Sequence, residues 1–283
     1  MISDRWKLAI DIGGTYLRSE LYSDQIIKKE RLATASSDLI AVIETYLKHY
    51  PQIASVGISF AGQVSDGVIL SSPNISVSHK NIKEYFETNY AVKLEIDNDL
   101  NCVIRAEAEY HQENYIAAIY VGTGLGAAVI DDAKIIRGSS NQSFELGHIP
   151  YKKAPFSCGC GKDNCIELFA SGLGLERWIR YNNTIEATQS IEVDLEQLKI
   201  EESEIAVAFE KALLYAVATL ITLTNPKVLV LGGGVIEKNP YLLGEIRERL
   251  STEALSVSLH RVQIVPSSLS NAAMDGAKLL ANY

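Results

Sequence analysis

The sequence predicts an α/β protein made of two related lobes. A strand, a glycine turn and a second strand occur twice, beginning near residues 8 and 116, about a hundred residues apart. That spacing is far longer than the repeat of a solenoid, so it indicates two similar halves facing each other. Between these segments, strand-like and helix-like patterns alternate, as in α/β proteins. With 283 residues, 47% of them hydrophobic, the chain can bury a core in each lobe.

The first lobe is predicted to begin with a hairpin. Segments 8–12 and 16–22 flank a Gly-Gly-Thr turn, which is typical of two short strands joined tightly. A third strand is predicted at 26–31 and an amphipathic helix at 38–49. Segment 54–60 carries Val, Ile and Phe without a charge, so we expect a buried strand there.

The first lobe continues with a strand at 92–96 and a helical pattern from 100 to 110. The second lobe repeats the opening pattern, with apolar strands at 116–121 and 127–130 around a Gly-Thr-Gly turn. The remaining predicted elements are a long apolar helix at 205–224, a buried strand at 228–231, and helices at 241–250 and 271–281.

These elements predict the domain boundaries. The second strand–turn–strand unit starts at residue 116, so we place the first lobe at 1–115 and the second at 116–270. The final helix follows the last segment of the second lobe. We expect residues 271–283 to return to the first lobe and complete it.

Charge and hydropathy exclude two classes of partner. The formal net charge is −9 and no basic run offsets it, so the chain would repel a phosphate backbone. No stretch approaches the roughly 18 consecutive apolar residues of a membrane helix, and residues 1–5 lack the core of a signal peptide. We therefore expect a cytoplasmic protein that binds neither nucleic acid nor membrane.

Three glycine turns follow predicted strands and indicate a nucleotide site. Glycine allows close backbone approach, and consecutive N–H groups form a concavity that binds phosphate. A plain hairpin explains any single turn equally well, but three together favour a nucleotide site, with Asp11 beside the magnesium ion of the nucleotide. Neither the dinucleotide-binding fingerprint nor the P-loop motif occurs. The predicted nucleotide contacts are Asp11, Gly13, Gly14, Thr15, Gly122, Thr123, Gly124, Gly232, Gly233 and Gly234.

One imidazole and three thiols crowd into a short segment and predict a zinc site. Four protein ligands suit closed tetrahedral Zn²⁺, which leaves no position for an activated water, so the metal would be structural. Buried free cysteines are the alternative interpretation. The predicted ligands are His148, Cys158, Cys160 and Cys165.

A run of carboxylates follows the strand predicted at 92–96. Phosphoryl transfer needs a base that receives the proton of the attacking hydroxyl, and Asp99 is the candidate. Asp97 competes for that role. A third interpretation is that these side chains only cap the helix that begins near Leu100.

The glycine turns resemble those of the superfamily of sugar kinases, heat-shock chaperone ATPases and actin, over essentially the whole chain. The zinc motif resembles that of the ROK family. The resemblance implies an actin-like, ribonuclease H-like fold whose two lobes close on ATP and Mg²⁺ in a cleft between them. It also implies a homodimer.

The same resemblance assigns the substrate side. It implies that Asn98 holds the sugar, that Asp99 is the catalytic base, and that Gly62 lies in a substrate-side turn. Sugar contacts are implied for Glu145, His148 and Glu167. Without the resemblance, the two glutamates would be interpreted as a solvated surface pair.

The expected activity is phosphorylation of a hexose at its 6-hydroxyl by ATP, with glucose as the leading substrate. N-acetylmannosamine kinase, N-acetylglucosamine kinase and fructokinase are the alternatives, because one substituent can decide specificity while the motifs stay the same. From another class, the ROK resemblance also implies a sugar-responsive repressor or a non-catalytic sugar-binding protein. A repressor would need a DNA-binding domain ahead of the first turn, which starts at Asp11.

Overall fold

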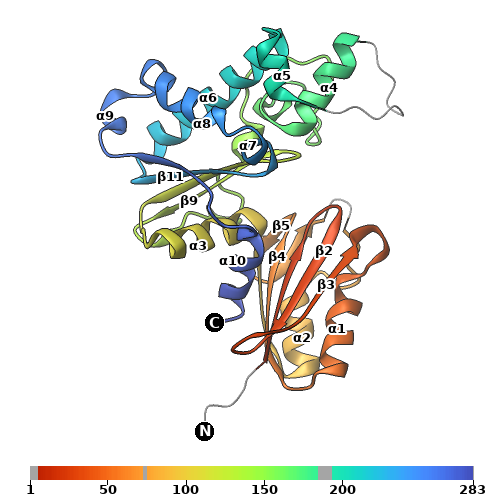
Figure 1. Cartoon of the computed structure of the whole chain (residues 1–283). Coiled ribbons are helices and arrows are strands. Elements are labelled where there is room, and N and C mark those ends of the chain that lie inside the picture. Colours follow the sequence, from red (N-terminus) through yellow and green to blue (C-terminus); the bar gives the residue numbers. More distant parts are fainter. Residues whose placement is uncertain (1–5, 73–74, 184–192, 283) are drawn as a thin grey trace. The chain divides into compact units, whose positions relative to one another are not determined.

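The computed structural model describes residues 6–72, 75–183 and 193–282, so residues 1–5, used above for the targeting prediction, lie outside it. The chain forms two compact units, and neither is one continuous segment (Figure 1). Unit 1 comprises Met1–His111, Arg137–Ser143 and Leu269–Tyr283, and unit 2 comprises Gln112–Ile136 and Phe144–Ser268.

Unit 1 is built on a five-stranded mixed sheet. Its strands, in the order β3-β2-β1-β4-β7, are β1 (Trp6–Ile12), β2 (Tyr16–Tyr22), β3 (Ile26–Ala33), β4 (Ile53–Phe60) and β7 (Lys93–Asn98). β2 is antiparallel to both β1 and β3, and β4 and β7 run parallel to β1. The register pairs Asp11 with Ser59 and Ser59 with Asp97. Polar side chains of three strands therefore meet at one edge of the sheet, where α/β proteins place their sites.

Alternation along β1 gives unit 1 its two packed faces. Leu8, Ile10 and Ile12 belong to the core shared with α1 (Leu39–His49) and α2 (Ile82–Tyr90). Ala9 points the other way and packs with Met274 and Ala277. That second face is covered by α10 (Ala272–Leu280), which also contacts α3 (Asp99–His111). A short hairpin of β5 (Gln63–Ser65) and β6 (Val68–Ser71) completes the unit.

Unit 2 repeats the sheet topology of unit 1. Its order is β10-β9-β8-β11-β12, and β11 and β12 run parallel to β8 while β9 and β10 are antiparallel to their neighbours. This agreement in order and direction bears out the repeat seen in the sequence. The strands are β8 (Ile116–Val121), β9 (Leu125–Asp131), β10 (Lys134–Ile135), β11 (Val228–Gly232) and β12 (Gln263–Pro266).

The helices of unit 2 include one that is long and apolar enough to cross a membrane, α6 (Glu204–Thr224). A search for consecutive apolar residues does not identify this helix, because Glu210 and Lys211 interrupt its apolar sequence. Its apolar window is 61% buried within the protein, as expected for a core helix. The others are α4 (Gly172–Asn183), α5 (Leu195–Ile200), α7 (Gly234–Lys238), α8 (Tyr241–Arg249) and α9 (Ser256–Leu259).

The elements expected from the sequence are present, with ends within about two residues. Several short elements were not predicted from the sequence, notably α2, α7, β10 and β12. Also not predicted was α4, the helix that follows the cysteine-rich segment. The domain boundaries drawn from the sequence did not include residues 137–143 in the first lobe, whereas the structure groups them with unit 1.

Candidate active site

Asp99 is the first residue of α3 and lies directly after β7. Its Oδ1 accepts a hydrogen bond from the Leu100 N–H at 2.9 Å. Burial raises the pKa of the Asp99 carboxyl to about 7 against that hydrogen bond, and the negative charge of Asp11 adds to the rise. A carboxylate with a pKa near neutrality suits a general base.

Asp97, the competing carboxylate, has the opposite environment. Arg137 donates to both of its oxygens, from Nη1 to Oδ1 at 2.9 Å and from Nη2 to Oδ2 at 2.6 Å. Burial alone would raise the pKa of Asp97, but Arg137, Asn101 and Asn141 outweigh it and lower the pKa. Asp97 is therefore ionised and engaged, and it is poorly suited to accept a proton.

Asn98, the last residue of β7, links this strand to the turn between β4 and β5. Its Oδ1 accepts from the Leu100 N–H at 2.9 Å, and its Nδ2 donates to the Gly62 carbonyl at 3.0 Å. Gly62 has no space for a side chain, since a Cβ there would clash with the Ser71 carbonyl and the Phe60 ring. The structure thus brings together Asn98, Asp99 and Gly62, all within unit 1. The capping interpretation also holds in part, because Asn98 and Asp99 both accept from Leu100.

The first glycine turn, between β1 and β2, is open on its outer side. Gly13 N–H donates to the Tyr16 carbonyl at 3.0 Å, which closes the turn. Gly14 and Thr15 are exposed, and a Cβ on Gly14 would meet nothing within 4 Å. A phosphate could therefore approach this backbone.

Asp11 stands at the base of that turn and is buried at the end of β1. Ser59 Oγ donates to its Oδ1 at 3.2 Å, and Arg18 Nη1 lies 3.1 Å from its Oδ2. Burial raises the pKa of Asp11, and Arg18 offsets part of that rise. Its oxygens are the ligand type that Mg²⁺ prefers. Ser59 and Arg18 were missed in the sequence, where no motif marks them.

A cavity of about 450 Å³ in unit 2 is lined in part by residues of the other two glycine turns. Gly122 and Thr123 line it from the turn after β8, and Gly234 lines it from the start of α7. A Cβ on Gly122 or Gly234 would meet nothing within 4 Å, so both leave room for a bound group. The volume is in the range of small-molecule sites.

The side chains around this cavity are mixed in character. Apolar ones suit a planar base, and charged ones suit a ribose or phosphate. Lining residues outside the glycine turns include Leu173, Glu176, Val193, Leu195, Val235, Lys238 and Asn239. These were not identified from the sequence, because they come from α4, α5 and α7, which carry no recognisable nucleotide motif.

Three of the glycines predicted in these two turns do not line the cavity. A Cβ on Gly232 would collide with the Tyr120 ring, and Gly233 takes φ +90° against the backbone of Val121. Both make the turn possible and are not among the cavity's lining residues. Gly124 faces Glu167 instead, with a Cβ position 3.1 Å from Oε2.

The four predicted zinc ligands converge in unit 2. The nearest donor atoms of His148, Cys158, Cys160 and Cys165 all lie within 4.8 Å of one another. His148 Nδ1 is 3.5 Å from Cys158 Sγ, and the sulfurs of Cys160 and Cys165 are 3.4 Å apart. Ligands about 2.0–2.3 Å from a tetrahedral zinc are separated by roughly 3.5–3.8 Å, so this donor set fits Zn²⁺.

The two glutamates lie against this cluster. Glu145 Oε2 is 3.9 Å from His148 Nε2, and Glu167 Oε1 is 3.7 Å from His148 Nδ1. Glu167 is only 20% exposed, and Cys158 Sγ donates to it at 2.7 Å. Glu145 is 51% exposed. The pair is therefore built around His148 and is not an isolated solvated pair.

Comparison with known proteins gives a family match over nearly the whole chain. The model described as "ROK family" matches residues 7–283. An N-acetyl-D-glucosamine kinase of Vibrio cholerae is 26% identical over 275 residues, covering 88% of this chain and 90% of that protein. A glucokinase of Halalkalibacterium halodurans is 25% identical over 292 residues, with 90% and 88% covered.

A solved structure agrees in fold. The ROK family glucokinase from Streptomyces griseus, in complex with glucose and AMPPNP, superposes with a TM-score of 0.76 at 24% identity, covering 98% of this chain and 99% of that one. The predicted fold class, an α/β protein with the two-lobed actin-like sugar kinase fold, is confirmed.

Proposed function

Because the chain belongs to the ROK family and its relatives described above are sugar kinases, we propose that it transfers the γ-phosphoryl group of ATP to the 6-hydroxyl of a hexose. One arrangement carries this proposal: Asp99 starts α3 directly after β7 with the pKa of its carboxyl raised to about 7, while Arg137 donates to both oxygens of Asp97, two residues earlier, and keeps it ionised. This is the arrangement a hydroxyl-activating base needs.

In the proposed reaction, Asp99 accepts the proton of the sugar hydroxyl as its oxygen attacks the γ-phosphorus, and ADP leaves. Asn98 holds the sugar, and its own orientation is fixed by Gly62 and Leu100. Asp11 would hold Mg²⁺, which when bound offsets the charge of the phosphates. The exposed glycine-turn backbones would cradle those phosphates.

In this proposal, the zinc site holds in place the residues of unit 2 that contact the sugar. His148, Cys158, Cys160 and Cys165 would hold structural Zn²⁺, which when bound fixes the loop that carries them. Cys158 is closest to Nδ1 of His148, which leaves Nε2 facing Glu145. Glu145, His148 and Glu167 would then present acceptors and a donor to neighbouring sugar hydroxyls.

Glucose is the proposed substrate. The solved relative from Streptomyces griseus contains glucose, and one of the relatives described is a glucokinase. N-acetyl-D-glucosamine is the second candidate, since the Vibrio cholerae relative is a kinase for that sugar. Mannose, fructose and N-acetylmannosamine complete the set of five sugars to be assayed.

The test is release of ADP from Mg-ATP with glucose, mannose, fructose, N-acetylglucosamine and N-acetylmannosamine, using protein purified without chelator. We expect turnover with one strongly preferred sugar. An absence of turnover with all five, together with saturable sugar binding measured by calorimetry, would instead support a non-catalytic sugar-binding regulator.

A further inference from the structure

The carboxylate of Asp97 accepts hydrogen bonds from several donors in addition to Arg137. It is 3% exposed, and its Oδ1 accepts from the Asn98 N–H at 2.9 Å as well as from Arg137. Asn101 Nδ2 donates to the same oxygen at 2.9 Å, and Asn141 Nδ2 does so at 3.2 Å. Such a densely bonded carboxylate can fix the geometry of the groups around it.

Two of these donors arrive from a distant part of the sequence. Arg137 and Asn141 belong to the segment Arg137–Ser143, which leaves unit 2 after β10, joins unit 1 and then returns. Gly138 and Asn141 take positive φ, +67° and +57°, which lets the segment turn tightly. Asn141 Nδ2 also donates to the Val64 carbonyl at 2.6 Å, which ties the segment to β5.

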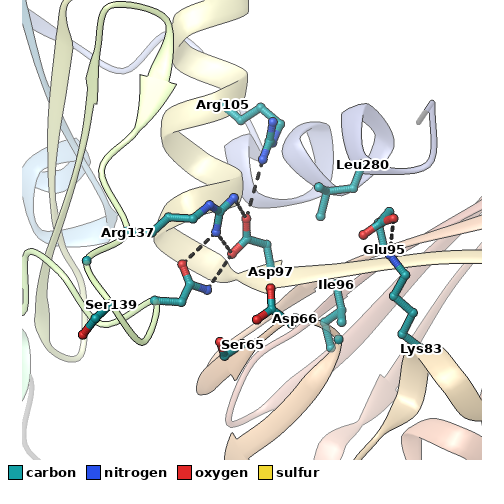
Figure 2. A pocket seen from close by; sticks show the side chains of 13 residues that line it. Ser65, Asp66, Lys83, Glu95, Ile96, Asp97, Arg105, Arg137, Ser139 and Leu280 are labelled. Atoms are coloured by element: carbon teal, nitrogen blue, oxygen red, sulfur yellow. Dashed lines mark hydrogen bonds and ion pairs between the residues drawn. The ribbon is translucent and has the colours of Figure 1, made fainter.

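The segment is also bonded internally. Arg137 Nη1 donates to Asn141 Oδ1 at 2.7 Å, so the two side chains hold each other against Asp97. Figure 2 shows Arg137 and Arg105 both pointing toward that carboxylate, with Arg105 Nη2 at 3.6 Å from Oδ2. Asp97 thus keeps a second cation if Arg137 is removed.

The residues that Asp97 fixes surround Asp99. Asn98 precedes Asp99, and its N–H is bonded to Asp97 Oδ1. Asn101 lies two residues after Asp99 in the first turn of α3, and its amide is bonded to the same oxygen and to Asn141 Oδ1. One carboxylate therefore holds the Asn98 backbone before Asp99 and the Asn101 side chain after it.

We propose that Arg137 and Asn141 are positioning residues that, through Asp97, set the place of the Asp99 carboxylate. This inference rests on the proposed function, in which Asp99 is the base. Neither residue needs to touch the substrate. Because an error of about 1 Å in a catalytic group costs about a hundredfold in rate, loss of this support lowers turnover more than binding.

The competing explanation is that the Arg137–Asp97 pair only stabilises the fold. Under that explanation, a variant that folds normally would also turn over normally. Replacing both members by neutral amides, Asp97→Asn with Arg137→Gln, avoids leaving a buried charge unpaired, which is the usual cause of instability in single variants. This double variant separates the two roles.

The chain also offers a matched control. Lys83 and Glu95 form an ion pair at 2.6 Å, and both line the same cavity of about 720 Å³ as Arg137. Figure 2 shows this pair to one side of Asp97. Their side chains are 32% and 40% exposed, and the two bond to each other and not to Asp97 or Asp99. Lys83→Met therefore removes a neighbouring ion pair without disturbing the support of Asp99.

The experiment compares kcat and KM of full-length wild type, Arg137→Met, Asn141→Ala, the double variant and Lys83→Met, each with its thermal unfolding curve. We expect kcat to fall about ten- to a hundredfold in the first three variants, with KM for sugar and ATP within about twofold. The double variant should still unfold in one cooperative transition. Lys83→Met should match wild type.

Two results would overturn the inference, and they are distinguishable from each other. A folded double variant with wild-type kcat shows that the pair is only structural, and the proposed kinase activity stands. A wild-type protein that transfers no phosphoryl group to any of the five sugars removes the proposed function and the positioning role with it.

Discussion

At the scale of single residues, the chain gives two nearby carboxylates opposite tasks. Asp97 receives a two-point contact from Arg137 and is kept ionised, whereas Asp99 is half-buried near Asp11, and its carboxyl holds the proton more tightly. Pairs of titratable groups whose pKa values are pushed apart mark acid–base chemistry. The environment of each carboxylate, and not its residue type, is the reason that Asp99 and not Asp97 is proposed as the base.

Asp99→Asn tests this assignment directly. The amide cannot accept the hydroxyl proton, so we expect kcat to fall by about 10²–10⁴-fold while sugar affinity changes little. Steady-state kinetics and calorimetric titration with the preferred sugar measure the two quantities. Asp66→Asn, which alters an acidic residue lining the cavity beside Arg137, serves as the control. An Asp99→Asn enzyme with near-normal turnover would remove Asp99 from the role.

The pH dependence follows from the same carboxyl. The base must be deprotonated, so kcat/KM for the sugar should rise with pH and level off above about pH 7. An acid limb near pH 4 would mean that the pKa of the base is not raised. In the Asp99→Asn variant this limb should disappear from the residual activity.

Stability should change in the opposite direction. The pKa of Asp99 is higher in the folded protein than its ordinary 3.8, so the folded state binds the proton more tightly. Its contribution to stability is therefore lost as pH rises from about 4 to about 7. Asp99→Asn should raise the unfolding temperature above pH 7 and leave it unchanged near pH 4. Thermal scans at both pH values check the sign.

The residues of the site differed in how far they could be predicted. Cys158, Cys160 and Cys165 crowd into one short segment, and Asp99 follows a recognisable strand, so local sequence sufficed. Arg137 lies forty residues from Asp97 and contacts it only because the chain returns to unit 1. Nothing local to Arg137 indicates that contact.

At the scale of elements, α10 depends on two close backbone approaches. A Cβ on Gly276 would clash with the backbone of Cys102 in α3, and one on Gly57 in β4 would clash with the Ala277 carbonyl. These glycines let the helix lie directly on the sheet and on α3. The helical period of α10 could be recognised in the sequence. The elements on which α10 packs could not be predicted, because a glycine residue does not indicate which backbone lies against it.

Gly276→Ala should therefore destabilise unit 1 by about 1–3 kcal/mol through overpacking. Gly244→Ala is the matched control, because a Cβ at Gly244 in α8 meets nothing within 4 Å. That change should stabilise the protein by about 0.4–1 kcal/mol. Urea denaturation measures both free energies of unfolding. Equal effects from the two substitutions would contradict the close packing of α10.

The cysteine-rich loop should depend on its metal. Cys165→Ser removes one ligand, so we expect loss of bound zinc, a lower unfolding temperature and at least about tenfold weaker sugar binding. Cys102→Ala, which alters the one cysteine outside the cluster, should keep one zinc per chain by elemental analysis. Chelator-treated wild type should behave like Cys165→Ser and recover with Zn²⁺. Zinc-free protein of unchanged stability and affinity would contradict the assignment.

At the scale of the whole molecule, one sheet topology is used twice. The orders β3-β2-β1-β4-β7 and β10-β9-β8-β11-β12 correspond strand for strand, including the change from antiparallel to parallel. The repeat was predictable because each copy starts with the same strand–turn–strand signature. The return of α10 to unit 1 was also expected, but its packing partners were not. The return of residues 137–143 was not predicted either, because it depends on contacts that are remote in sequence.

Removal of residues 269–283 should loosen unit 1 and spare unit 2, because α10 packs on β1, β4 and α3. The two tryptophans report the units separately: Trp6 packs against Tyr50, and Trp178 Nε1 donates to the Leu168 carbonyl. We expect the truncated chain to lose the cooperative fluorescence transition of Trp6 in a Trp178→Phe background. The transition of Trp178 in a Trp6→Phe background should remain.

Full-length chains with the same single tryptophans provide the reference curves. If the Trp6 transition survives truncation at an unchanged midpoint, α10 is dispensable for unit 1. If both transitions disappear, the two units depend on each other for folding.

The packing of α10 also has a consequence for biosynthesis. The ribosome makes the strands of unit 1 first and α10 after every strand of both sheets. Until α10 emerges, the face of the sheet around Ala9 and the side of α3 around Cys102 remain uncovered, while unit 2 already has all its elements. The half of the protein that is translated first is therefore completed last. During translation it is the half with the longest need for a chaperone that shields apolar surface.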